Sequence, residues 1–319
     1  MILACMLLLF LAVLLSMGFG AVPIGPAGIL RGLAESGTAE NRILLHVRLP
    51  RTLAAVLAGA GLAASGVVMQ AVLANPLASP GIIGVNAGAG LGAVLCGALI
   101  PGAVPLVPLA AFIGALCAVL LVYGISARAG AARVTLILSG VAVSSLMTAG
   151  INTVTTFVPD AVTGARAFQI GGLSSVSPRI LLPAGCFIAV SILLLCLMGR
   201  ELDILGLGES TALSLGLDTA RYRFIFLVLA AALAGAAVSF AGLIGFVGLI
   251  IPHAGRLVVG NDSRPLLIVS ALAGAAFLTI CDTVAKTAFS PYELPVGILA
   301  AFLGTPFFLW LLFRAGRAQ

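Results

Sequence analysis

The chain has 319 residues, of which 61% are hydrophobic and 8% carry a charge, against about 25% charged residues in an ordinary soluble domain. This composition excludes a disordered chain, which has low hydrophobicity and high net charge. It also excludes a soluble globular protein, which needs more charged residues to cover its surface. The net charge of +6 comes from basic residues scattered singly between apolar runs, a pattern unlike that of a nucleic-acid binder. We therefore predict an all-α polytopic membrane protein, with one transmembrane domain over residues 1–319.

At about 20 residues per crossing, the chain has room for about ten spans. The apolar N-terminus lacks the basic residues that open a signal peptide, so we interpret it as the first span. Prolines place several breaks, because a residue before proline is pushed out of the α region. The ten spans are expected near residues 2–18, 52–73, 81–99, 106–126, 134–157, 180–199, 224–241, 243–259, 266–288 and 295–313.

The fifth expected span carries more hydroxyl and amide groups than the others. Its polar residues recur at intervals of three or four and so share one helix face: Ser145, Thr148, Asn152 and Thr156. Met147 lies next to this stripe in the sequence. This stripe either lines a water-filled path or forms hydrogen bonds to neighbouring helices. The residues themselves leave the two interpretations open.

The connection between the sixth and seventh spans, residues 200–222, is the longest one on the side of the two termini. Gly208 and Gly216 bracket a helix of about two turns, since glycine commonly ends helices. Ala212, Leu215 and Gly216 would share one face of it. A short amphipathic helix of this kind lies on a membrane or docks a partner.

Ionisable groups near span ends are candidate functional residues. Asp282 and Lys286 are four residues apart on the ninth span, which is the spacing of an ion pair along a helix. Arg48 and Arg51 open the second span, where basic side chains often extend to lipid headgroups.

Several catalytic signatures are absent from the sequence. It contains no Walker phosphate-binding loop, no H-E-x-x-H and no G-x-S-x-G. The six cysteines lie inside apolar runs without Cys-x-x-Cys spacing, which favours packing over metal binding. We expect neither an enzyme nor a resident metal or cofactor.

Six stretches together resemble the permease subunits of ABC importers for iron–siderophore complexes, haem and cobalamin, and the match runs from about residue 40 to Arg317. They are Arg48-Leu49-Pro50-Arg51, the small-residue run 59–66, Asn75-Pro76-Leu77-Ala78-Ser79-Pro80-Gly81, the Gly-Glu-Ser to Leu-Gly-Leu segment 208–217, the run 245–253 ending in Pro-His, and Glu293-Leu294-Pro295-Val296-Gly297.

The resemblance implies ten transmembrane helices per subunit in a type II ABC importer bundle, similar to the vitamin B12 importer permease. It implies a second permease subunit (identical or different), two ATPase subunits that bind ATP and magnesium, and a periplasmic or lipid-anchored binding protein. Its location would be the inner or cytoplasmic membrane of a prokaryote. The function implied is ATP-driven import of a metal chelate, iron–siderophore above haem or cobalamin; an ion-gradient-driven secondary transporter or a membrane scaffold is the alternative.

The resemblance also implies roles for three groups of residues. The loop 200–222 would couple to the ATPase through Gly208, Glu209, Ala212, Leu215 and Gly216. The translocation pathway would be lined by Ser145, Met147, Thr148, Asn152 and Thr156. The binding protein would dock on Arg48, Arg51 and Lys286.

Overall fold

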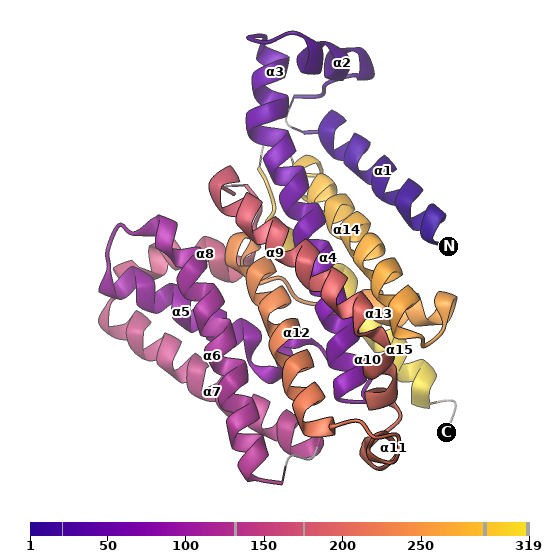
Figure 1. Ribbon diagram of the computed structural model, residues 1–319. Coiled ribbons are helices and arrows are strands. Elements are labelled where there is room, and N and C mark those ends of the chain that lie inside the picture. Colours follow the sequence, from indigo (N-terminus) through magenta and orange to yellow (C-terminus); the bar gives the residue numbers. More distant parts are fainter. Residues whose placement is uncertain (21, 131–132, 175, 290–291, 317–319) are drawn as a thin grey trace.

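The computed structural model describes residues 1–20, 22–130, 133–174, 176–289 and 292–316, and these residues form helices and loops (Figure 1). The long helices are α1 (Ile2–Gly18), α4 (Leu49–Val72), α5 (Val85–Leu99), α6 (Val107–Arg128), α7 (Arg133–Phe157), α9 (Pro178–Leu197), α12 (Thr219–Ala241), α13 (Val247–Val259), α14 (Ser263–Thr287) and α15 (Val296–Gly316).

Shorter helices connect them: α2 (Pro26–Ala34), α3 (Ala39–Ile43), the π-helical turn η1 (Leu44–Arg48), the 3-10 turns η2 (Pro80–Ile83) and η3 (Val104–Leu106), α8 (Asp160–Ile170), α10 (Gly199–Gly206) and α11 (Glu209–Ser214). Helices α2 and α3 stand at one end of the bundle, and α11 lies at the opposite end (Figure 1). These are called here the α2 end and the α11 end.

Every one of the ten expected spans coincides with a helix. Within the described residues, six helical stretches are long and apolar enough to cross a membrane: Ala39–Val72 with α4, Val104–Arg128 with α6, and α7, α9, α12 and α14. The other four expected spans correspond to the shorter apolar helices α1, α5, α13 and the part of α15 up to Trp310. Length and composition therefore single out six crossings, not ten.

Helix α4 forms the centre of the bundle, with α14 and α12 packed along it. Glycine makes this possible: a Cβ at Gly59 would overlap the backbone carbonyl of Gly274 in α14, and one at Gly66 would overlap that of Gly248 in α13. In membranes, where apolar burial does not distinguish protein from lipid, such close backbone contact stabilises helix pairs. The small-residue faces in the sequence are therefore packing surfaces.

Helices α5, α6 and α7 pack together on one flank of the bundle (Figure 1). Gly88 and Gly92 of α5 lie directly against the backbone of α6, at Gly114 and Ala110. Gly84, four residues before Gly88, precedes α5 with a φ of +86° and faces α7 at Ser144. This arrangement leaves part of α7 uncovered.

Candidate functional site

The uncovered part of α7 bears the polar stripe. Ser145, Thr148 and Asn152 are exposed, and they line a hollow of about 550 Å³ that α7 shares with Gly81 and Ile82 of η2. The two elements touch because Gly140 of α7 lies against the backbone of Ile82, where a Cβ would overlap the carbonyl. The structure therefore groups three of the expected pathway residues around one open surface.

Two of the stripe hydroxyls form hydrogen bonds within α7. Thr148 donates to the carbonyl of Ser144 at 2.8 Å, and Thr156 donates to that of Asn152 at 2.7 Å. These bonds satisfy the hydroxyls without a neighbouring helix, so they do not support the interpretation of the stripe as a packing device.

Two of the residues expected in the pathway lie outside the hollow. Met147 is partly buried and packs against the apolar core, so it does not line this hollow, and its place in the pathway stays a prediction. It precedes Thr148 by one position, which turns its side chain about 100° away around the helix. Thr156 is exposed but lies one turn beyond the lining residues.

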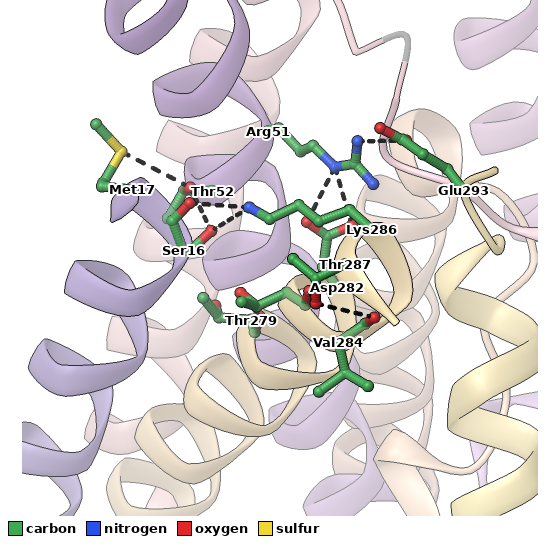
Figure 2. A network of polar contacts seen from close by, with 11 residues as sticks. Ser16, Met17, Arg51, Thr52, Thr279, Asp282, Val284, Lys286, Thr287 and Glu293 are labelled. Atoms are coloured by element: carbon green, nitrogen blue, oxygen red, sulfur yellow. Dashed lines mark hydrogen bonds and ion pairs between the residues drawn. The ribbon is translucent and has the colours of Figure 1, made fainter. Parts of the chain in front are cut away.

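A buried polar network joins α1, α4, α14 and the segment before α15 at the α2 end (Figure 2). The Nε of Arg51 lies 3.0 and 2.9 Å from the two carboxylate oxygens of Asp282, and the Nη1 of Arg51 lies 2.7 Å from Oε2 of Glu293. Asp282 is 1% exposed and Arg51 11%, whereas Glu293 is 43% exposed. Arg51 thus ties the start of α4 both to α14 and to the segment before α15.

The sequence spacing had suggested that Asp282 pairs with Lys286. In the structure the carboxylate faces Arg51, and the Lys286 ammonium donates to the backbone carbonyl of Ser16 at 2.9 Å and lies 3.1 Å from its hydroxyl. The Ser16 hydroxyl in turn lies 2.7 Å from that of Thr52. Lys286 therefore holds the end of α1 against α14.

Arg48 is also buried, at 5% exposure, and donates to the backbone carbonyls of Met17, Gly18 and Val22. The carbonyls of Met17 and Gly18 belong to the last turn of α1, where a basic side chain commonly satisfies backbone acceptors, and that of Val22 lies in the loop that follows. Docking of the binding protein on Arg48, Arg51 and Lys286 stays a prediction, whereas the expectation that their charges are exposed is wrong. All three are turned inward and bonded within the chain, because the sequence showed their position at span ends but not the carbonyls and carboxylates facing them.

At the α11 end, α11 is bracketed by Gly208 and Gly216, with φ of +113° and +81°. This confirms the glycine-bounded helix expected in the loop 200–222. Three leucines are exposed here: Leu207 at 64%, Leu213 at 55% and Leu215 at 60%. A set of exposed leucines thus surrounds the short helix.

The face expected on this helix is wrong in one respect. Ala212 is fully buried in the chain's own core, so it does not share an exposed face with Leu215 and Gly216. The helix ends at Ser214, and the left-handed Gly216 then turns the chain so that the Leu217 N–H donates to the Ala212 carbonyl. The exposed apolar side chains are instead the leucines at positions 207, 213 and 215.

Several residues of these sites were missed by sequence reasoning. Arg223, a 3% exposed residue of α12, was not expected; it forms an ion pair at 3.0 Å with Glu209 of α11, which the sequence had placed in the coupling loop. Glu293 and Ser16 belong to the network at the α2 end, and Gly81 and Ile82 belong to the hollow. Opposite charges flanking the short helix were the one available signal, and it concerned Arg223. Among the described residues, His, Cys, Asp and Glu form no group of three that could hold a metal ion.

Fold and site together define a membrane permease chain that is helical throughout its described spans, with a polar helix face along one flank and a short helix flanked by exposed leucines at one end. The sequence profile of the FecCD transport family matches residues 8–314. The chain belongs to this family of transport permeases.

Its relatives are named for the import of different compounds. The Fe(3+)-citrate import system permease protein YfmE of Bacillus subtilis is 36% identical over 322 residues, covering 100% of this chain and 96% of that protein. The hemin transport system permease HmuU of Yersinia pestis is 36% identical, covering 96% and 94%. The vitamin B12 import system permease BtuC of Salmonella arizonae is 38% identical, covering 99% and 94%.

A solved structure has the same fold over nearly the whole chain. It is a transporter chain assigned to the metal-chelate type of ABC transporter, in an inward-facing conformation, with a TM-score of 0.88, 29% identity and coverage of 98% of both chains. A more distant match, PsaBC of Streptococcus pneumoniae, has a TM-score of 0.62 at 19% identity and shows the fold alone.

Proposed function

We propose that this chain is the permease subunit of an ATP-driven importer that moves a metal chelate through an interface between two permease subunits. The observation that carries the proposal is the exposed polar face of α7, which lies in an otherwise apolar spanning helix. Ser145, Thr148 and Asn152 offer hydroxyls and an amide without any formal charge. Such a surface suits a large chelate that must slide past without losing its metal, better than a tight charged site does.

The cargo belongs to the class carried by the relatives: ferric citrate, haem or cobalamin. The hollow on one chain is shallow and open. A second permease subunit facing it would enclose a central path lined by the polar face of α7 from both subunits. In this arrangement α1, α5, α13 and α15 cross the membrane together with the six longer spans, giving ten crossings and placing the α11 end in the cytoplasm of a prokaryotic cell.

The partners follow from the chain's two ends. ATP and magnesium would bind to two separate ATPase subunits, which would contact the exposed Leu207, Leu213 and Leu215 around α11. A periplasmic or lipid-anchored binding protein would deliver the chelate at the α2 end.

Reconstitution separates this proposal from a secondary transporter. The chain, its cognate ATPase and binding protein are placed in liposomes, and uptake of ferric citrate, haem and cobalamin is measured with and without ATP. We expect uptake of one chelate that needs ATP and continues when ionophores collapse proton and sodium gradients. Uptake that needs the gradient and ignores ATP would contradict the proposal.

A further inference from the structure

A second pocket lies between α6, α9 and α12 and shares no lining residue with the hollow on α7. It has a volume of about 350 Å³, and its lining includes Pro108, Phe112, Pro183, Phe187 and Arg179. The rings of Phe112 and Phe187 meet edge to face with centroids 5.8 Å apart. Gly235 of α12 lets Phe112 lie close, since a Cβ there would be 3.3 Å from the ring. The pocket is therefore shaped by prolines and by this edge-to-face pair of rings.

The surface around this pocket is apolar. Leu109 and Ile113 of α6 are 56% and 50% exposed, and Leu182 and Phe187 of α9 are 74% and 40% exposed. Both helices belong to the stretches long and apolar enough to cross a membrane. In a bilayer, this surface would place the mouth of the pocket against hydrocarbon chains.

Arg179 is the charged residue of the lining. It lies in the first turn of α9, where the N-cap residue Ser177 makes no side-chain capping bond. The same level of α12 carries Ala236 and Ser239, near the end of that helix remote from α11. A helix N-terminus adds partial positive charge to that of the guanidinium, which favours an anion. The pocket therefore combines an apolar body with a positive rim at one end of a spanning helix.

We propose that this pocket binds one phospholipid with an anionic headgroup, whose acyl chain occupies the pocket while its phosphate contacts Arg179. The volume is at the lower end of the ~300–1,000 Å³ typical of ligand sites, so it accommodates a segment of one chain but no bulky chelate. An acyl chain gains little by leaving other lipid tails for an apolar pocket. Selectivity among lipids therefore comes from the charge of the headgroup.

Native mass spectrometry of the delipidated full-length chain tests the site, with phosphatidylglycerol and phosphatidylcholine of identical acyl chains as probes. We expect the wild type to bind phosphatidylglycerol more tightly. Arg179→Gln should weaken that binding about fivefold, the ~1 kcal/mol of one basic residue beside anionic lipid, and leave phosphatidylcholine unchanged. Arg31→Gln, an exposed arginine of α2, is the matched control and should change neither.

Filling the pocket should act differently from removing the charge. Ala184→Phe is expected to weaken the binding of both lipids. Size-exclusion elution of the variant shows whether it is folded. Independently of any variant, phosphatidylglycerol with a photoreactive acyl chain should cross-link to α6 or α9 of the wild type. Equal affinity of the wild type for the two lipids, an unchanged Arg179→Gln, or cross-links confined to other helices would overturn the proposal. A photoreactive group placed at position 184 that cross-links to another protein subunit in the assembled transporter would overturn it as well, because the pocket would then face protein and not lipid.

Discussion

The buried ion pair between Arg51 and Asp282 should be the most sensitive polar contact of the bundle. Replacing Asp282 by Asn keeps the volume of the side chain and removes its charge. The guanidinium of Arg51, 11% exposed, would then keep only Glu293 as a charged partner, and that residue is 43% exposed. Breaking one side of a buried pair costs about 3–5 kcal/mol, because the remaining charge stays buried without compensation.

A double variant separates the loss of the pair from the exposure of one uncompensated charge. Arg51→Met together with Asp282→Leu removes both charges, and an apolar replacement of a buried pair is often neutral or stabilising. We therefore expect the double variant to be more stable than Asp282→Asn. Glu293→Gln is the control for an exposed pair at the same arginine and should cost about 0–1 kcal/mol.

Unfolding in mixed micelles, with increasing fractions of a denaturing detergent, measures these differences. Asp282→Asn should lose several times more free energy of unfolding than Glu293→Gln. If both variants lose the same small amount, or if the double variant is the least stable of the three, the description of Asp282 as the buried anchor of Arg51 is wrong.

Two further predictions concern helix packing and the α11 end. Gly66→Ala should destabilise the fold by about 1–3 kcal/mol by overpacking, because its Cβ would overlap Gly248. Gly124→Ala is the control and should be neutral, because its Cβ meets nothing within 4 Å. Equal effects of the two variants in the same assay would refute the close contact of α4 and α13. Glu209→Arg should reduce uptake per ATP hydrolysed by placing a like charge beside Arg223, and the swap with Arg223→Glu should restore part of it; a swap no better than the single variant would argue against a link from α11 to α12.

Helix positions were largely readable from the sequence. All ten expected spans coincide with helices, because apolar length and proline breaks are local properties of the chain. The glycines that bracket α11 were likewise visible, since left-handed turns at helix ends favour glycine. The polar stripe on α7 followed from helical periodicity alone, and Ser145, Thr148 and Asn152 share the hollow.

Contacts between distant segments were not readable. Arg51 and Asp282 are 231 positions apart and Lys286 is 270 from Ser16, so no spacing rule connects them. Basic residues at span ends were therefore predicted to point outward, when carbonyls at the end of α1 and a carboxylate on α14 hold them inside. Ala212 was misplaced for a related reason, because the core of other helices, and not the pattern of its own, determines which side of α11 is buried.

The central claim is that the polar face of α7 lines the path of the chelate. In a cysteine-free importer assembled with its ATPase, Asn152→Cys should react with a charged, membrane-impermeant thiol reagent, and the attached group should block ATP-dependent uptake. Leu182→Cys, 74% exposed on the apolar face of α9, is the control and should not react. If Asn152→Cys stays unlabelled in every nucleotide state, or if its labelling leaves uptake unchanged, α7 does not line the path.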